Sequence, residues 1–166
     1  MASTSLPDAA WEQRLAALWS RLDTLAEEDF IAQMETLVRE LPEDSAVASF
    51  ERACAQDSTG HSDRAVPLYR RALSLGLQGI RRRRAVIQMA SSLRNTGHVD
   101  ESVALLTEER TRGSDELDAA LAGFLALCLV DVGREREAVS LSLQALAPLL
   151  PRYQRSLGNY ARALLG

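Results

Sequence analysis

The sequence has no lysine, few aromatic residues, and only two cysteines and two histidines. Aromatic residues make up 5% of the chain, so the side chains that pack well on a pleated sheet are scarce. Alanine and leucine dominate the apolar set, and arginine and glutamate carry much of the charge. These residues lose little side-chain freedom in a helix. The composition therefore predicts an all-α protein, and 166 residues fit one domain.

The two cysteines, Cys54 and Cys128, lie far apart in apolar surroundings and form no CxxC motif. We expect both to be reduced, buried thiols. No apolar run approaches the roughly 18 residues that span a bilayer, and the N-terminus lacks the features of a secretory signal. The sequence therefore predicts a cytoplasmic protein without membrane contact.

Residues for catalysis or metal binding are also missing from any recognisable arrangement. His61 and His98 each follow a glycine, and an aspartate stands two residues after each. If these are equivalent turns of stacked helix pairs, they lie roughly 10 Å apart, whereas zinc ligands lie about 2 Å from the metal. The sequence holds no GxxxxGK[ST], HExxH or GxSxG motif. We expect no enzyme activity, no cofactor and no metal site.

Three similar segments organise the chain, and they begin at Gly60, Gly97 and Gly133. They read "GHSDRAVPLYRRAL", "GHVDESVALLTEER" and "GREREAVSLSLQAL", with spacings of 37 and 36 residues between the glycines. A glycine at the end of a helix supplies the left-handed residue that closes it, so each segment predicts two helices joined at the glycine.

Small residues mark where the two helices of each pair should cross closely. One stands seven residues before each glycine and one five residues after it. The predicted crossings are Ala53 with Ala65, Ala90 with Ser102, and Ala126 with Ala138. A single helix pair cannot bury both apolar faces, so successive pairs should stack.

The flanking regions extend this pattern into one helical-repeat domain over 1–166. Apolar stripes predict an N-terminal helix pair over 1–42, with Asp29 as an N-cap, and Ala32 marks it as a degenerate repeat because it stands 33 residues before Ala65. Pro151 is expected in the first turn of a C-terminal capping helix. The predicted parts are 1–42, repeats at 46–79, 83–114 and 119–150, and the capping helix at 151–166.

The repeat pattern resembles the tetratricopeptide repeat: a glycine, a step of five to Ala or Ser, then Tyr69 or Leu106, then Ala72 or Ala145. The phrases "FERACAQDSTGHSDRAVPLYRRALSLGL" and "RRRRAVIQMASSLRNTGHVDESVALL" bring it closer to the bacterial group 5 tetratricopeptide-repeat family, over about residues 28–165. Glu109 and Ser142 depart from the pattern. The resemblance implies a right-handed superhelical stack of antiparallel helix pairs with about nine helices, protein or peptide partners, and a homodimer.

In such arrays the first helix of each pair lines a concave groove where partners bind. Counting each glycine as position fifteen, the groove positions are two, five, six, nine, twelve and thirteen. The polar groove residues of the second repeat are then Arg84, Gln88, Ser91, Arg94 and Asn95, beside the apolar Ile87. In the third repeat the groove includes Phe124, Leu127 and Val130, an apolar face for self-association or ordinary packing.

Four consecutive arginines, Arg81 to Arg84, begin the second repeat. Successive helical residues turn by about 100°, so four neighbours cannot share a face. Only Arg84 should face the groove, while the other three should spread over the outside and pair with acidic residues of the preceding helix pair. Residues 1–60 carry a net charge of −8, residues 61–112 of +5 and residues 113–166 of −1.

Together these features predict a non-catalytic protein-interaction module that binds a peptide, a protein or its own copy. An arginine-dependent nucleic-acid-associated or regulatory accessory protein is the alternative. A net charge of −4 argues against a general nucleic-acid binder, because that activity rests on many phosphate contacts.

Overall fold

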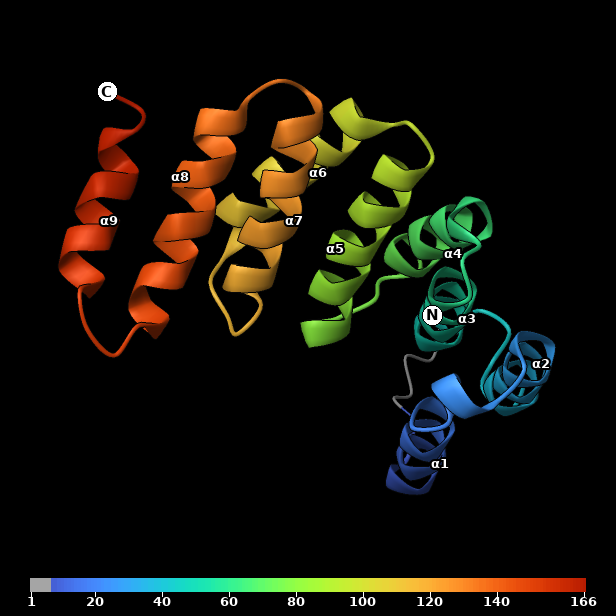
Figure 1. Cartoon of the computed structure of the whole chain (residues 1–166). Helices are drawn as coiled ribbons and strands as arrows, with labels where there is room; N and C mark the ends of the chain where they lie inside the picture. The colour runs from blue at the N-terminus through green and yellow to red at the C-terminus, as the bar shows by residue number, and fades with distance from the viewer. Residues whose placement is uncertain (1–6) are drawn as a thin grey trace. The chain divides into compact units, whose positions relative to one another are not determined.

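The computed structural model describes residues 7–166, and within that range the chain forms helices and no strands. The nine α-helices of these described residues (Figure 1) confirm the predicted all-α class and number of helices. They are α1 (Ala9–Trp19), α2 (Glu27–Val38), α3 (Ala46–Ser58), α4 (Ser62–Ser74), α5 (Gly79–Asn95), α6 (Val99–Arg112), α7 (Asp118–Asp131), α8 (Glu135–Leu146) and α9 (Gln154–Ala163). Two short 3₁₀ helices lie at Leu22–Thr24 and Ala147–Leu149. None of the helices in this part of the chain is both long enough and apolar enough to cross a membrane.

The chain divides into two compact units, Met1–Ser92 (unit 1) and Leu93–Gly166 (unit 2). Helix α5 runs through the division, with all four consecutive arginines on its unit 1 side. Each unit is described separately below.

The three repeat glycines end their helices as the sequence predicts. Gly60, Gly97 and Gly133 have φ angles of 87°, 85° and 74°, in the left-handed region that favours glycine. After each glycine, the next backbone N–H donates back to a carbonyl five residues earlier, at 2.8 Å in all three turns. This bond, typical of a Schellman motif, satisfies a carbonyl at the helix end and turns the chain into the second helix of the pair.

The predicted small residues lie at closely packed positions. Ala53 and Ala65 are completely buried where α3 packs on α4, and Ala126 and Ala138 are buried where α7 packs on α8. The α3–α4 pair is also joined by the Ser49 hydroxyl, which donates to the Leu68 carbonyl at 3.0 Å. Small side chains let two backbones approach, so each pair acts as one packed layer.

The N-terminal pair α1–α2 packs through large side chains, which corrects two expectations. Ala32 is exposed and does not mark the crossing, whereas Phe30 is completely buried, with its ring centroid 5.1 Å from that of Trp19. The N-cap of α2 is Ala26, so Asp29 lies inside the first turn, where a carboxylate favours the positive end of the helix dipole. The Trp11 indole N–H donates to the Leu37 carbonyl at 3.0 Å and holds the two helices together.

Helix α9 begins later than predicted. Leu150 before Pro151 is extended, as a residue that precedes proline prefers, and the helix starts at Gln154. Tyr153 takes a left-handed conformation with φ of 69° between them. The prediction that Pro151 lies in the first helical turn is therefore wrong.

Candidate functional site

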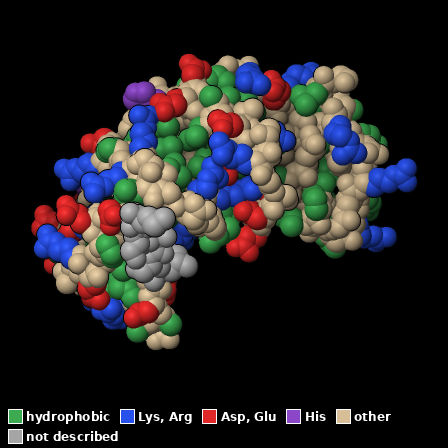
Figure 2. All heavy atoms as spheres, turned by 180° about the vertical axis from the view of Figure 1, so that it is seen from behind, with side chains coloured by type: hydrophobic (Ala, Val, Ile, Leu, Met, Phe, Trp, Pro, Cys, Tyr) green, Lys and Arg blue, Asp and Glu red, His purple; other side chains and the backbone are tan. Residues whose placement is uncertain are grey.

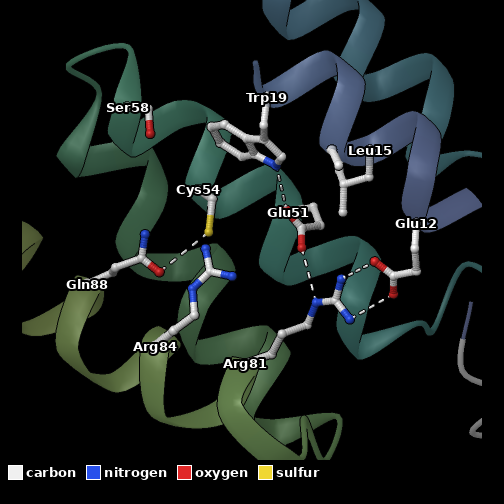
Figure 3. A pocket seen from close by; sticks show the side chains of 10 residues that line it. Glu12, Leu15, Trp19, Glu51, Cys54, Ser58, Arg81, Arg84 and Gln88 are labelled. Carbon is white, nitrogen blue, oxygen red and sulfur yellow. Dashed lines mark hydrogen bonds and ion pairs between the residues drawn. The ribbon is translucent and has the colours of Figure 1, made fainter. Parts of the chain in front are cut away.

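Unit 1 contains a cavity of about 260 Å³ between three of its helices (Figure 3). Helices α1, α3 and α5 each supply one part of the lining. The lining residues are Glu12, Leu15, Ala16 and Trp19 from α1, Glu51, Cys54 and Ser58 from α3, and Arg81, Arg84 and Gln88 from α5.

The lining residues follow the repeat register. Glu51, Cys54 and Ser58 occupy positions six, nine and thirteen of the first repeat, and Arg84 and Gln88 occupy positions two and six of the second. The four residues of α1 have the same spacing as positions two, five, six and nine. This register places Leu18 and Phe30 where the later pairs have alanine or serine, which explains why the N-terminal pair crosses through large side chains.

Glu51 places a carboxylate inside the protein, with only 1% of the residue exposed. Its oxygens accept hydrogen bonds from the Trp19 indole N–H at 3.1 Å and from Arg81 Nε at 3.2 Å. Burial raises the pKa of the Glu51 carboxyl above its ordinary value, because loss of water disfavours the charged form. The positive charges of Arg81 and Arg84 and the Trp19 hydrogen bond oppose that rise.

Arg81 connects all three helices of the cavity. Besides its bond to Glu51, its two terminal nitrogens donate to the two carboxylate oxygens of Glu12 at 2.9 and 2.6 Å (Figure 3). The prediction that Arg81 pairs with an acidic residue of the preceding helix pair is confirmed by Glu51. The second partner, Glu12, lies 69 residues away, and no pattern in the sequence pointed to it.

Arg84 lies beside Arg81 but uses its guanidinium differently. The guanidinium carbon lies 5.2 Å from the centroid of the Phe50 ring, a distance at which cation and ring attract each other. Figure 3 shows the guanidinium directed into the cavity near Cys54 and Gln88. Between residues 7 and 166, no carboxylate lies within ion-pair distance of Arg84, which is exposed.

Cys54 is a buried thiol, as the sequence predicts. Its Sγ lies 3.6 Å from Gln88 Oε1 and 3.7 Å from the hydroxyl oxygen of Tyr69. Burial raises its pKa to about 12, with a smaller contribution from the Glu51 charge. At neutral pH the sulfur therefore carries its proton and is a poor nucleophile.

One residue of the arginine run, Arg83, lies on the buried side of α5 and not on its outside. Arg83 is 7% exposed and shares the buried side of α5 with Ile87 and Ala90, which are four and seven residues further along. The expectation that Arg83 faces outward is wrong, and so is the expectation that Ile87 faces a groove. Residues at these spacings share one face of a helix. Because Ile87 and Ala90 are apolar and pack inward, Arg83 lies on the same inward face.

The remaining predicted groove residues have different surroundings. Ser91 is half-buried and Asn95 is exposed. In unit 2, Arg94 donates to both carboxylate oxygens of Asp131, at 2.5 and 3.3 Å. Its guanidinium therefore has an internal anionic partner, in contrast to Arg84.

The apolar residues predicted on α7 reach the surface of unit 2 to different degrees. Phe124 is half-buried, while 48% of Leu127 and 49% of Val130 are exposed. Packing within unit 2 therefore leaves part of this apolar stripe accessible.

The family model of the tetratricopeptide repeat matches residues 46–164, which is more than half of the chain. The chain belongs to the group 5 tetratricopeptide-repeat family. The matched region begins at α3 and leaves out the α1–α2 pair, which crosses through large side chains. The search of curated proteins and the search of solved structures gave no significant match.

The charged surface of this tetratricopeptide-repeat protein is mixed. In the space-filling view, arginine side chains lie among acidic and apolar ones (Figure 2). No group of three or more histidine, cysteine, aspartate or glutamate residues suited to a metal ion occurs in the part of the chain that the structure describes.

We expect Arg81→Ala to lower the free energy of unfolding by about 3–5 kcal/mol, because it leaves the buried Glu51 carboxylate without its ionic partner. Urea unfolding followed by circular dichroism measures this loss. Arg14→Ala is the matched control, because it removes an ion pair with Glu40 in which both side chains are about half exposed, and little change is expected. Equal effects of the two substitutions would contradict the role given to Arg81.

We also expect the pH dependence of stability to change in Glu51→Gln. The raised pKa means that the folded state holds the Glu51 proton more tightly than the unfolded chain does. Wild type should therefore lose stability relative to Glu51→Gln as the pH rises above the unfolded value of about 4.5. Urea unfolding of both proteins from about pH 4 to about pH 8 measures the difference. A difference that moves in the opposite direction would mean that the ionic bond to Arg81 outweighs burial.

Proposed function

We propose that the chain is a non-catalytic protein-interaction module that binds a peptide or protein partner in the cavity of unit 1. The family supports the general part of this proposal, because tetratricopeptide repeats build protein-interaction modules. The specific part rests on one observation: the cavity is lined by groove positions of the repeat, and it contains an arginine without a carboxylate partner among the described residues.

The chemistry of the lining favours binding over catalysis. Cys54 carries its proton at neutral pH, and no histidine lines the cavity. Glu51 and Arg81 bond to each other, and each has a further partner in α1. Side chains held in this way give the cavity a fixed shape, which lowers the entropic cost of binding.

A nucleic-acid partner fits the cavity less well. Arg81 already bonds to two carboxylates, and Arg83 is buried. The carboxylates of Glu12 and Glu51 would also face an incoming phosphate. Since nucleic-acid binding needs several accessible cations, we favour a protein partner. We propose that the two proteins meet in the cytoplasm.

Self-association through α7 of unit 2 is a second candidate function. The exposed Leu127 and Val130 support it, because they lie three residues apart on one face of α7 and contiguous exposed apolar side chains mark protein contacts. Asp131 follows Val130 on α7, and its carboxylate already bonds to Arg94 within the chain. Because these charges are paired internally, the contact between the two chains of such a homodimer would be formed by the apolar stripe of each chain.

A photo-activated cross-linker at Ala16 tests the interaction module in cells. Ala16 and Ala17 are both exposed, but only Ala16 lines the cavity, so a cross-linker at Ala17 is the matched control. We expect a discrete protein adduct from Ala16 that is absent from Ala17. The adduct should survive nuclease treatment and moderate salt, because steep salt dependence indicates phosphate contacts. An adduct that nuclease removes, or no adduct at all, would contradict the proposal.

Sedimentation equilibrium at micromolar protein tests self-association. We expect the mass of a dimer for wild type and of a monomer for Leu127→Glu, because the new charge would be buried in the interface. Ala119→Glu places the same charge on an exposed position of the same helix outside the apolar stripe, and should stay dimeric. A monomeric wild type would rule out the dimer.

A further inference from the structure

We propose that the unit 1 cavity recognises one side-chain carboxylate of the partner, an aspartate or glutamate next to an apolar residue, and that Arg84 binds it. The inference rests on the proposed interaction function and names the chemistry of the partner. It follows from the free donors of Arg84, the charges around them and the size of the cavity.

The two arginines that line the cavity differ in how many donors remain for a ligand. A guanidinium has five N–H groups. Three nitrogens of Arg81 donate to Glu12 and Glu51, so this side chain is held in place. The guanidinium of Arg84 lies over the Phe50 ring, and among the described residues no hydrogen bond from Arg84 to a side chain or carbonyl is found. Its edge is therefore available for the paired hydrogen bonds that a carboxylate accepts.

The charges around Arg84 favour a ligand group with a single negative charge. Glu12 and Glu51 line the same cavity and both bond to Arg81, so the charges of Arg81 and Arg84 together balance the two carboxylates. A phosphate group with about two charges would be repelled by these carboxylates more strongly than a carboxylate would. Phosphorylated residues and inorganic phosphate are therefore disfavoured.

The size and the apolar wall of the cavity indicate a peptide. The volume of about 260 Å³ is below the roughly 300–1,000 Å³ of sites that enclose a whole small molecule. It suits one side chain that enters from a longer ligand. Beside Glu12, the residues Leu15, Ala16 and Trp19 form the apolar part of the wall contributed by α1, and these side chains can cover an apolar neighbour of the acidic residue.

The two tryptophans provide a reporter and its internal control. The Trp19 indole N–H donates to Glu51 in the cavity lining, so its NMR signal should respond to a ligand there. The Trp11 indole N–H donates to the Leu37 carbonyl and does not line the cavity. A shift of the first signal alone therefore reports binding in the cavity.

The test is a titration of the ¹⁵N-labelled full chain with two blocked peptides, acetyl-Gly-Leu-Glu-Gly-amide and its glutamine counterpart. We expect the glutamate peptide to shift the Trp19 signal saturably and to bind about tenfold or more tightly than the glutamine peptide, because a hydrogen bond to a charged group is at stake. Arg84→Gln should remove this preference. Arg64→Gln, on an exposed position of α4 away from the cavity, should keep it.

Further ligands separate the possible sources of the anion. The glutamine peptide with a free C-terminal carboxylate tests whether the cavity binds the end of a chain. Inorganic phosphate tests whether it binds an anion with two charges. Tighter binding of either one than of the glutamate peptide would overturn the inference. Equal binding of the two blocked peptides would overturn it as well. So would an Arg84→Gln variant that still prefers the glutamate peptide, provided that its Trp11 and Trp19 signals without ligand match those of wild type. In these cases a protein adduct from Ala16 would still stand, so failure here is distinct from failure of the interaction function.

Discussion

The buried carboxylate of Glu51 imposes a charge requirement that determines how the rest of unit 1 is arranged. A carboxylate removed from water is costly unless cations and hydrogen-bond donors compensate it. Arg81 and Trp19 do so from α5 and α1 on either side of α3. Arg81 also binds Glu12, so the same cation joins the first helices of three successive pairs. The shape of the cavity follows from these bonds.

This use of Arg81 also explains why neighbouring arginines in one run have different roles. Three residues further along, Arg84 points into the same cavity and meets an aromatic ring instead of a carboxylate. Arg83, between them, is turned to the buried side of the helix. Three members of a run that looks like a uniform basic patch in the sequence therefore differ: Arg81 is held by carboxylates, Arg83 is buried and Arg84 is accessible. Of these three, only Arg84 is exposed.

Much of the fold could be predicted because its determinants are local and periodic. The spacing of Gly60, Gly97 and Gly133 defined the turns, and the alanines seven residues before and five after Gly60 and Gly133 marked the crossings. The errors arose where a different local rule competed. Ala26 takes the cap position that Asp29 was expected to fill, and Tyr153 follows Pro151 with a left-handed backbone. Neither of these residues is a usual choice at its position, so the sequence carried no signal for them.

The candidate site could be predicted only in part, because register and pairing have different physical origins. Register is set within one helix, and it placed Arg84 and Gln88 in one cavity with Glu51 and Cys54. Pairing depends on the side chain that the neighbouring helix presents. Arg84 and Arg94 were both assigned to a groove, yet Phe50 contacts one and Asp131 binds the other. A repeat therefore fixes which positions can meet a partner, while the residues of adjacent repeats decide which of those positions keep free donors.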